Sequence, residues 1–480
     1  MYQSKLAEHI RDLSAKDREQ FRQFVCSPYF NQHQKTKELL EFLLKKVDGR
    51  PSGLTKEKVY KKLFPGKAFE EQQLYNVMSY LKKLYYQFMA MEYIRKQRYL
   101  EVLYTIEEAF DTHQFDIMTN RGKHLQKKLK KDPVHNSEYY YTNYRLNHAL
   151  GYYSGHYFNR AETDTFQHML DELDNFYIVE KLRNCCHLTA NSIMMNTTYE
   201  FRMLDELMGY LEANWEIYRE ETSIVLYYTV LKSLTTPNER HYYQRMKKML
   251  ADEMDQLSKQ EGRDLYGFSY NYCIMMINAG HSDFQMELFQ LYKQGLRQGL
   301  LLDKGLLSEW DYKNIATLGA RLKAFEWTEA FLQKYKDKLP PHRRENAYNY
   351  NLGNLYYNKG MYNEALSALL VVQFTDVKYH LSTNFLILRT YYALKDTEAL
   401  LSLIETFRIY VIRNRKMTVE QKRGYTNFLR FAKKLVLIKH HASTYSNKEL
   451  EKEVDSLSAK INETENVINR YWLLEECQQE

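Results

Sequence analysis

Apolar residues in this chain recur at the spacing of α-helices. The clearest stripe places apolar side chains three and four positions apart, at Leu74, Val77, Met78, Leu81, Leu84, Tyr85 and Phe88. This spacing keeps all of them on one face of a helix. From about residue 99 similar segments follow one another, as roughly eight pairs separated by short turn signals. Alternating, strand-like runs are absent, so we expect an all-α chain.

Helix-breaking residues are scarce and lie where helices should stop. The chain has 7 prolines and 17 glycines among 480 residues, well below the average usage of about 5% and about 7%. The prolines all fall between apolar segments, at Pro28, Pro51, Pro65, Pro133, Pro237, Pro340 and Pro341. Long, uninterrupted helices are expected between these positions.

A short sequence period marks residues 308–412. Glu-Ala steps at 329–330, 364–365 and 398–399 are separated by 35 and 34 residues, and Leu-Gly steps at 318–319 and 352–353 by 34. A period near 34 is the length of one helix-turn-helix unit. Such a unit cannot bury its apolar face alone, so neighbouring units must stack. We therefore expect an α-solenoid of antiparallel helix pairs.

The middle unit, residues 347–377, resembles a tetratricopeptide repeat (TPR). Four positions of that family's pattern are matched with the right mutual spacing, by Leu352, Gly353, Tyr356 and Ala365. The following unit departs from the pattern, because Arg389 stands where glycine is expected. The resemblance implies a TPR-like fold in which small residues let the two helices of a pair approach closely.

These patterns suggest four parts. We expect a small helical N-terminal module at 1–95, a degenerate helical-repeat region at 96–307, TPR-like repeats at 308–412, and basic helices with a C-terminal capping helix at 413–480. The segment Ser27-Pro28-Tyr29-Phe30-Asn31 also resembles the start of uncharacterised helical-repeat proteins from Bacteroidota-type bacteria. That likeness supplies no function. Residues 54–88 are also compatible with a DNA-binding helix-turn-helix or winged-helix module. Against this, Glu70 and Glu71 would place two carboxylates at the start of the second helix, where they would repel the DNA phosphates.

The TPR resemblance implies a concave groove for an extended peptide or a helix. Its positions fall on Lys313, Lys323, Tyr350, Asn354, Tyr357 and Asn358. Amides can grip a peptide backbone, because they donate and accept hydrogen bonds together, and rings add apolar area. The alternative is that these are ordinary solvated helix positions. The family's lysine-containing clamp for chaperone tails is not matched, since Tyr350, Thr383 and Ile387 occupy its other diagnostic positions.

The strongest charge feature is the stretch 408–439, with ten bases, one acid and a net charge of +9 in a chain of net charge +7. Its candidate basic patch comprises Arg413, Arg415, Lys416, Lys422, Arg423, Arg430, Lys433 and Lys434. Interleaved aromatic residues could stack on bases, and phosphates or an acidic protein would be attracted. Residues 446–480 carry a net charge of −5, so internal neutralisation is a third possibility.

The C-terminal region shows a seam of its own. Spacings of four and three place one a/d heptad seam at Leu450, Val454, Leu457, Ile461, Thr464, Ile468 and Tyr471. A helix that covers the exposed end of a solenoid would have this pattern, and so would a dimer seam. The chain could therefore be a monomer or a homodimer through this helix.

Catalytic motifs are missing. We find no P-loop, HExxH or nucleophile elbow, and expect no enzyme activity, metal or cofactor. Asp164, His168 and Asp171 share a helix face as a possible metal half-site, but a solvated surface explains them equally. Five cysteines without a CxxC pair favour a reduced, cytoplasmic protein. No apolar run reaches the ~18 residues of a membrane span.

We therefore expect a non-enzymatic scaffold or adaptor that binds a protein or peptide through a TPR-like groove. The alternative from another class is a nucleic-acid-associated regulator that uses the basic stretch 408–439.

Overall fold

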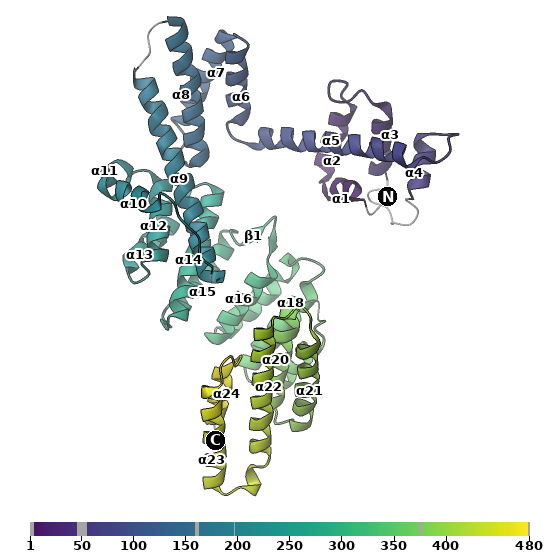
Figure 1. Cartoon of the computed structure of the whole chain (residues 1–480), viewed down its shortest axis with the longest axis vertical. Helices are drawn as coiled ribbons and strands as arrows, with labels where there is room; N and C mark the ends of the chain where they lie inside the picture. Colours follow the sequence, from purple (N-terminus) through teal and green to yellow (C-terminus); the bar gives the residue numbers. More distant parts are fainter. Residues whose placement is uncertain (1–3, 46–54, 159–162, 196, 374–376, 479–480) are drawn as a thin grey trace. The chain divides into compact units, whose positions relative to one another are not determined.

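The computed structural model describes residues 4–45, 55–158, 163–195, 197–373 and 377–478. These residues form 24 α-helices, three short 3-10 helices and two two-residue strands (Figure 1). They divide into two compact units, Met1–Lys181 and Leu182–Glu480. The expectation of an all-helical chain built from packed neighbouring helix pairs is confirmed.

The first unit begins with five helices around a shared core. They are α1 (Lys5–Asp12), α2 (Ala15–Cys26), α3 (Gln34–Leu44), α4 (Lys56–Leu63) and α5 (Glu71–Lys96). The predicted stripe on α5 is largely buried in this core, where it meets Phe21, Leu40 and Val59. The loop at 27–31 is held by Asn31, whose amide donates to the Val25 carbonyl at 2.8 Å and accepts from the His33 N–H at 2.8 Å. Buried amides need such partners.

The remaining helices of this unit are α6 (Leu100–Asp111), α7 (Phe115–Leu129), α8 (Ser137–Phe158) and the start of α9 (Thr163–Met195), which ends in the second unit. Helices α6, α7 and α8 bury a second apolar cluster that includes Ile106, Leu125 and Leu146. Each of these residues lies on the inner stripe of its own helix, as the spacing predicts.

The second unit contains the other helices. They are α10 (Leu204–Ala213), α11 (Trp215–Tyr218), α12 (Thr222–Thr235), α13 (Arg240–Asp252), η1 (Met254–Gln256), α14 (Lys259–Asn278), α15 (Phe284–Arg297), α16 (Glu309–Arg321), α17 (Phe325–Tyr335), η2 (Lys336–Lys338), α18 (Arg344–Asn358), α19 (Tyr362–Leu370), α20 (Val377–Ala393), α21 (Thr397–Arg413), α22 (Val419–His440), η3 (Ala442–Thr444), α23 (Asn447–Glu463) and α24 (Arg470–Gln478).

A short β-hairpin interrupts this series, which the sequence did not predict. Strand β1 (Leu302–Asp303) pairs antiparallel with β2 (Leu306–Leu307). The two residues between them, Lys304 and Gly305, have positive φ angles of 49° and 82°. Two such residues form the tight turn that suits the twist of a two-stranded ribbon. The strands are too short to show the alternation by which strands are recognised in a sequence.

Three successive helix pairs, α16–α17, α18–α19 and α20–α21, close with the same turn. A left-handed residue ends the first helix of each pair, at Lys323 (φ 57°), Gly360 (φ 77°) and Lys395 (φ 60°). The next N–H then bonds back to the helix, from Ala324 to the Gly319 carbonyl at 2.9 Å, from Met361 to Tyr356 at 2.9 Å, and from Asp396 to Tyr391 at 3.1 Å. This is the Schellman cap. The same cap also ends α6 and α14, where Gln114 donates to Ala109 at 2.7 Å and His281 to Met276 at 3.0 Å.

The small residues of the period lie where helices touch. A Cβ added to Gly353 would lie 2.6 Å from Leu369 Cγ and 3.2 Å from the Ala365 carbonyl oxygen. A Cβ added to Gly319 would lie 2.3 Å from the Thr328 hydroxyl oxygen. Only glycine allows helices to approach this closely.

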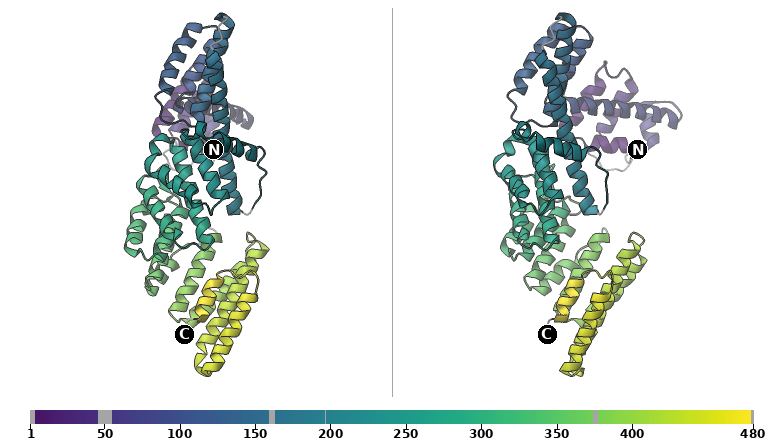
Figure 2. Two further views of the ribbon diagram at one scale, coloured as in Figure 1. Left: turned by 90° about the vertical axis from the view of Figure 1, so that its left-hand side faces the viewer. Right: turned by 60° about the vertical axis from the view of Figure 1, so that its left-hand side comes forward.

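The C-terminal helices pack on the last pair. Helices α22 and α23 run beside each other (Figure 2), and Phe407, Phe428, Leu435, Leu457 and Trp472 share one core. The predicted continuous seam at 450–471 is wrong, because α23 ends at Glu463 and α24 starts at Arg470. Two left-handed asparagines lie in the connection, Asn466 (φ 51°) and Asn469 (φ 54°).

The seam residues therefore have different environments. Leu457 and Ile461 are buried within the chain's own core, whereas Tyr471 is 89% exposed. Leu450 and Val454 pack on the same core. The heptad spacing of residues 450–461 reflects the apolar stripe by which α23 packs on this core.

Candidate functional site

The first helices of the three pairs carry a cluster built around Lys313. Its ammonium group on α16 donates to the Ser382 hydroxyl on α20 at 3.0 Å. It also lies 4.8 Å from the ring centre of Tyr350 on α18, 5.7 Å from that of Tyr379 on α20 and 5.9 Å from that of Trp310 on α16. We call Trp310, Lys313, Tyr350, Tyr379 and Ser382 the lysine–aromatic cluster.

The rings of the cluster also pack on one another. Tyr379 lies 5.8 Å from Trp310 and 5.6 Å from Tyr350, between ring centres. Tyr350 and Tyr379 are buried, whereas Trp310 is 40% exposed. Burial raises the pKa of Tyr350 to about 12, against a lowering effect of the Ser382 hydrogen bond. A cation among rings is held by their quadrupoles, with about 0.5–2 kcal/mol per contact. The cluster is thus ordered inside and open to solvent at Trp310.

Three more predicted groove residues follow Tyr350 along the same face of α18. The Asn354 amide nitrogen is buried and has no hydrogen-bond partner among the described residues. Its main-chain carbonyl accepts from the exposed Asn358 side chain at 2.7 Å. Tyr357 lies under the guanidinium of Arg389, whose carbon is 4.7 Å from the ring centre. A buried donor without an acceptor is costly, and a bound ligand could supply the acceptor.

The structure separates the last predicted groove residue from the others. Lys323 is exposed in the turn between α16 and α17, away from the helical face of Lys313 and Tyr350. Sequence reasoning also missed Trp310, Tyr379 and Ser382. Trp310 could have been found, because it lies one turn before Lys313 in a chain with only 4 tryptophans. Tyr379 and Ser382 gave none, because their unit departs most from the TPR pattern.

The basic stretch keeps most of its charge unpaired. Among the eight predicted patch residues, in the part of the chain that the structure describes, only Lys433 forms an ion pair, with Glu405 on α21 at 2.8 Å. Lys422 donates to the Ile412 carbonyl at 2.9 Å. The exposed members are Arg413, Arg415, Lys416, Arg423 and Arg430. Internal neutralisation by the acidic C-terminal helices is therefore not found for these eight residues.

The aromatic residues of this stretch do not form a stacking surface. Phe428 and Phe431 are buried in the core, and Tyr410 stacks on His380 with ring centres 3.5 Å apart. The expectation that these rings could stack on bases is wrong for both phenylalanines, because the apolar stripe of α22 faces α21 and α23. A polyanion could therefore contact this stretch only through its charged side chains.

One buried polar network joins α9, α12 and α14. The Asp264 carboxylate accepts from Tyr227 at 3.1 Å and Gln260 at 2.8 Å, and lies 3.5 Å from His187 Nε2. Burial opposes ionisation of Asp264, but the hydrogen bonds from these three residues outweigh it and hold its pKa below the ordinary value. Ser223 donates to Glu261 at 2.6 Å in the same region. The contacts of Tyr227 and His187 with Asp264, and of Ser223 with Glu261, tie α14 to α12 and α9, whereas the Gln260 contact lies within α14.

This network holds no reactive nucleophile. The Cys186 thiol is buried and donates to the Tyr227 carbonyl at 3.2 Å, and burial raises its pKa well above the ordinary value. A reactive cysteine needs a lowered pKa and access. No group of three or more His, Cys, Asp or Glu residues in the described ranges is arranged to hold a metal ion. Nor is any described helix long and apolar enough to cross a membrane.

No protein-family model matches the sequence, and no curated protein matches it.

Proposed function

We propose that this chain is a non-enzymatic interaction scaffold, in which α16–α21 form a TPR-like solenoid that binds a protein or peptide segment over the face of α16, α18 and α20. We call this the first-helix face. The observation that carries the proposal is the lysine–aromatic cluster, which spans three successive first helices and reaches solvent at Trp310. Interfaces favour such aromatic anchors, whose rings are already ordered before binding.

Two further features support the same face. The buried Asn354 amide without a partner offers a donor to a peptide carbonyl. The glycines of the sequence period, Gly319 and Gly353, lie where the two helices of a pair approach closely, as the TPR resemblance implies. All five cysteines are free thiols, as expected in a reducing compartment. A cytoplasmic location is part of this proposal.

Site-specific photo-crosslinking in the native host tests the proposal. A photoreactive amino acid replaces Trp310 or Asn354, and in a matched control it replaces Tyr471, which is also an exposed ring but lies on α24. We expect one discrete crosslinked partner from positions 310 and 354 and none from 471. Absence of any crosslink at both test positions, or the same pattern at all three, would contradict the proposal.

A second candidate function rests on the five exposed bases without carboxylate partners. They would bind a polyanion such as RNA or DNA by phosphate contacts alone, since Phe428 and Phe431 are buried. Such binding is indifferent to base sequence and weakens linearly in log[salt]. The triple variant Arg413→Gln, Arg415→Gln, Lys416→Gln removes three phosphate contacts. It should therefore reduce the slope of log K against log[salt] by about three. An unchanged slope would exclude this patch.

A further inference from the structure

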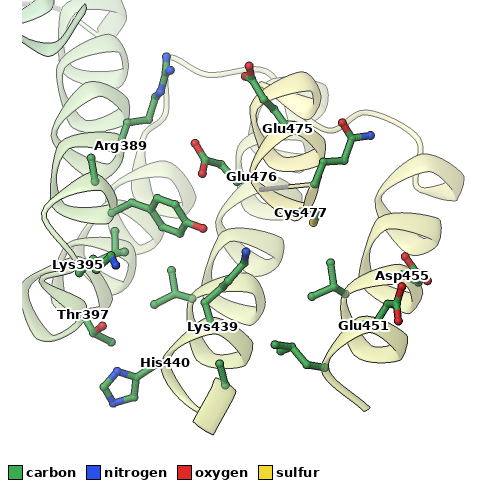
Figure 3. A pocket seen from close by; sticks show the side chains of 18 of the residues that line it. Arg389, Lys395, Thr397, Lys439, His440, Glu451, Asp455, Glu475, Glu476 and Cys477 are labelled. Carbon is green, nitrogen blue, oxygen red and sulfur yellow. The ribbon is translucent and has the colours of Figure 1, made fainter. Parts of the chain in front are cut away.

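A large pocket lies within the second unit, beside the last helix pair. Its volume is about 1370 Å³, and its lining comes from the ends of α18 and α20, from α21 and α22, and from α23 and α24 (Figure 3). The apolar part of the lining includes Leu400, Val436, Leu450 and Val454. Pockets for small molecules usually span about 300–1000 Å³. This one exceeds that range, so it has room for a ligand larger than a typical small molecule.

Charges of opposite sign occupy different walls of the pocket. Arg389, Lys395 and Lys439 project from α20, the following turn and α22 (Figure 3), whereas Glu451 and Asp455 come from α23 and Glu475 and Glu476 from α24. Burial raises the pKa of Glu476, while the nearby Arg389 and Lys439 lower it. A ligand that presents one sign to each wall would complement this arrangement.

Arg389 is the unusual member of the lining. It occupies the α20 position that corresponds to Gly353 on α18, after a leucine in both repeats. The structure explains the departure, because the side chain leaves the helix pair and lies among rings. Its guanidinium carbon is 4.7 Å from the ring centre of Tyr357, 5.7 Å from that of Phe385 and 6.0 Å from that of Trp472.

The guanidinium donates a hydrogen bond to Tyr357 and attracts the nearby Glu476 carboxylate, but one of its donors lacks an acceptor. Among the described residues Arg389 forms no ion pair, and its Nε is buried without a hydrogen-bond acceptor. A planar guanidinium that aromatic rings hold in place retains its forked set of donors, which matches the two oxygens of a carboxylate. The missing acceptor is the second, independent indication of a ligand.

We propose that this pocket binds a peptide segment of a protein partner. An acidic side chain of the peptide pairs with Arg389, and a basic side chain faces Glu451 and Asp455. An apolar side chain packs against the apolar lining residues, which include Leu400 and Val454. The site goes beyond the first-helix face; of the six predicted groove residues, Tyr357 also lines this pocket. The glycine-to-arginine departure therefore adds a specificity-determining residue where the repeats meet the C-terminal helices.

The probe is a library of short random peptides displayed on phage and selected on the immobilised full-length chain. Selected peptides are then synthesised, and their affinity is measured by fluorescence anisotropy. We expect enrichment of peptides that combine an Asp or Glu with an apolar residue and a Lys or Arg. Arg389→Gln should weaken their binding about ten- to a hundredfold, as expected for a charge-assisted hydrogen bond, and Trp310→Ala should leave it unchanged.

Three results would overturn the proposal. The first is that no peptide is enriched relative to selection on the Arg389→Gln chain. The second is loss of affinity with Trp310→Ala and not with Arg389→Gln, which would move the ligand to the first-helix face and leave the scaffold proposal standing. The third is a dimer in size-exclusion chromatography that Arg389→Gln dissociates, which would identify a second copy as the occupant. If Arg389→Gln fails to fold, Lys395→Glu at an exposed position of the same wall makes the same test.

Discussion

The ammonium group of Lys313 lies 4.8 Å from the centre of the Tyr350 ring, although the two residues belong to different helix pairs. The same group reaches Ser382 on the third pair at 3.0 Å. One side chain therefore connects α16, α18 and α20. We therefore expect this contact to contribute to the stability of all three pairs.

Removing the cation tests this coupling. Lys313→Ala should lower the free energy of unfolding of the second unit by about 1 kcal/mol, through lost cation–π contacts. The measurement is urea denaturation in a cycle with Tyr350→Leu, which isolates the pairwise term. The control Lys452→Ala replaces an exposed lysine on α23 and should change little. Strict additivity of Lys313→Ala and Tyr350→Leu would show that the contact contributes nothing.

The close approach at Gly353 gives a second prediction. Gly353→Ala places a Cβ 2.6 Å from Leu369 Cγ and should destabilise the chain by about 1–3 kcal/mol, as overpacking does. The matched control is Gly209→Ala on α10, where an added Cβ meets nothing within 4 Å. It should stabilise by about 0.5–1 kcal/mol, because alanine loses less backbone entropy than glycine in a helix. Thermal denaturation reports both, and equal effects would contradict the packing argument.

The recurrent cap gives a third prediction. Lys395 has a positive φ of 60° at the position that Gly360 occupies in the preceding pair. Lys395→Gly should stabilise the chain by up to about 1 kcal/mol, since glycine adopts this conformation without the steric cost of a side chain. Gly360→Ala should destabilise by about the same amount. Lys452→Gly, inside helix α23, is the control and should cost about 1 kcal/mol. If Lys395→Gly destabilised the chain, Lys395 would not be the left-handed residue of this helix cap.

The pH dependence of stability should reveal Asp264. Burial raises the folded-state pKa of Asp264, but hydrogen bonds from His187, Gln260 and Tyr227 outweigh this effect and hold the pKa below its ordinary value. The ordinary pKa of an aspartate in an unfolded chain is about 3.9. The contribution of Asp264 to stability is therefore complete above that pH and is lost as the pH falls through the folded-state value. Asp264→Asn should destabilise more at pH 7 than near pH 3 in urea denaturation. The same loss at both pH values would exclude an ionised Asp264.

Local patterns of the chain were sufficient for the helices and for some of their contacts. Apolar spacing predicted the buried stripe of α5, and the TPR resemblance of residues 347–377 implied that Gly353 and Ala365 would let two helices approach. Both follow from residues a few turns apart, because helix periodicity is a local property. Of the six predicted groove residues, Lys313 and Tyr350 meet in one cluster, Asn354, Tyr357 and Asn358 follow on α18, and Lys323 lies in a turn.

Contacts between distant segments were decided by the tertiary structure alone. Nothing near Lys313 in the sequence indicates that Tyr379 and Ser382 will surround it, because that depends on how three helix pairs stack. The same holds for Phe428 and Phe431, which the sequence left available to bases but which are buried, Phe428 beside Phe385 and Trp472. It also holds for Arg389, whose departure from the glycine pattern is explained only by its position beside Tyr357 and Trp472. Sequence spacing determines which face of a helix is apolar; which neighbour that face meets depends on the summed packing of all the helices around it.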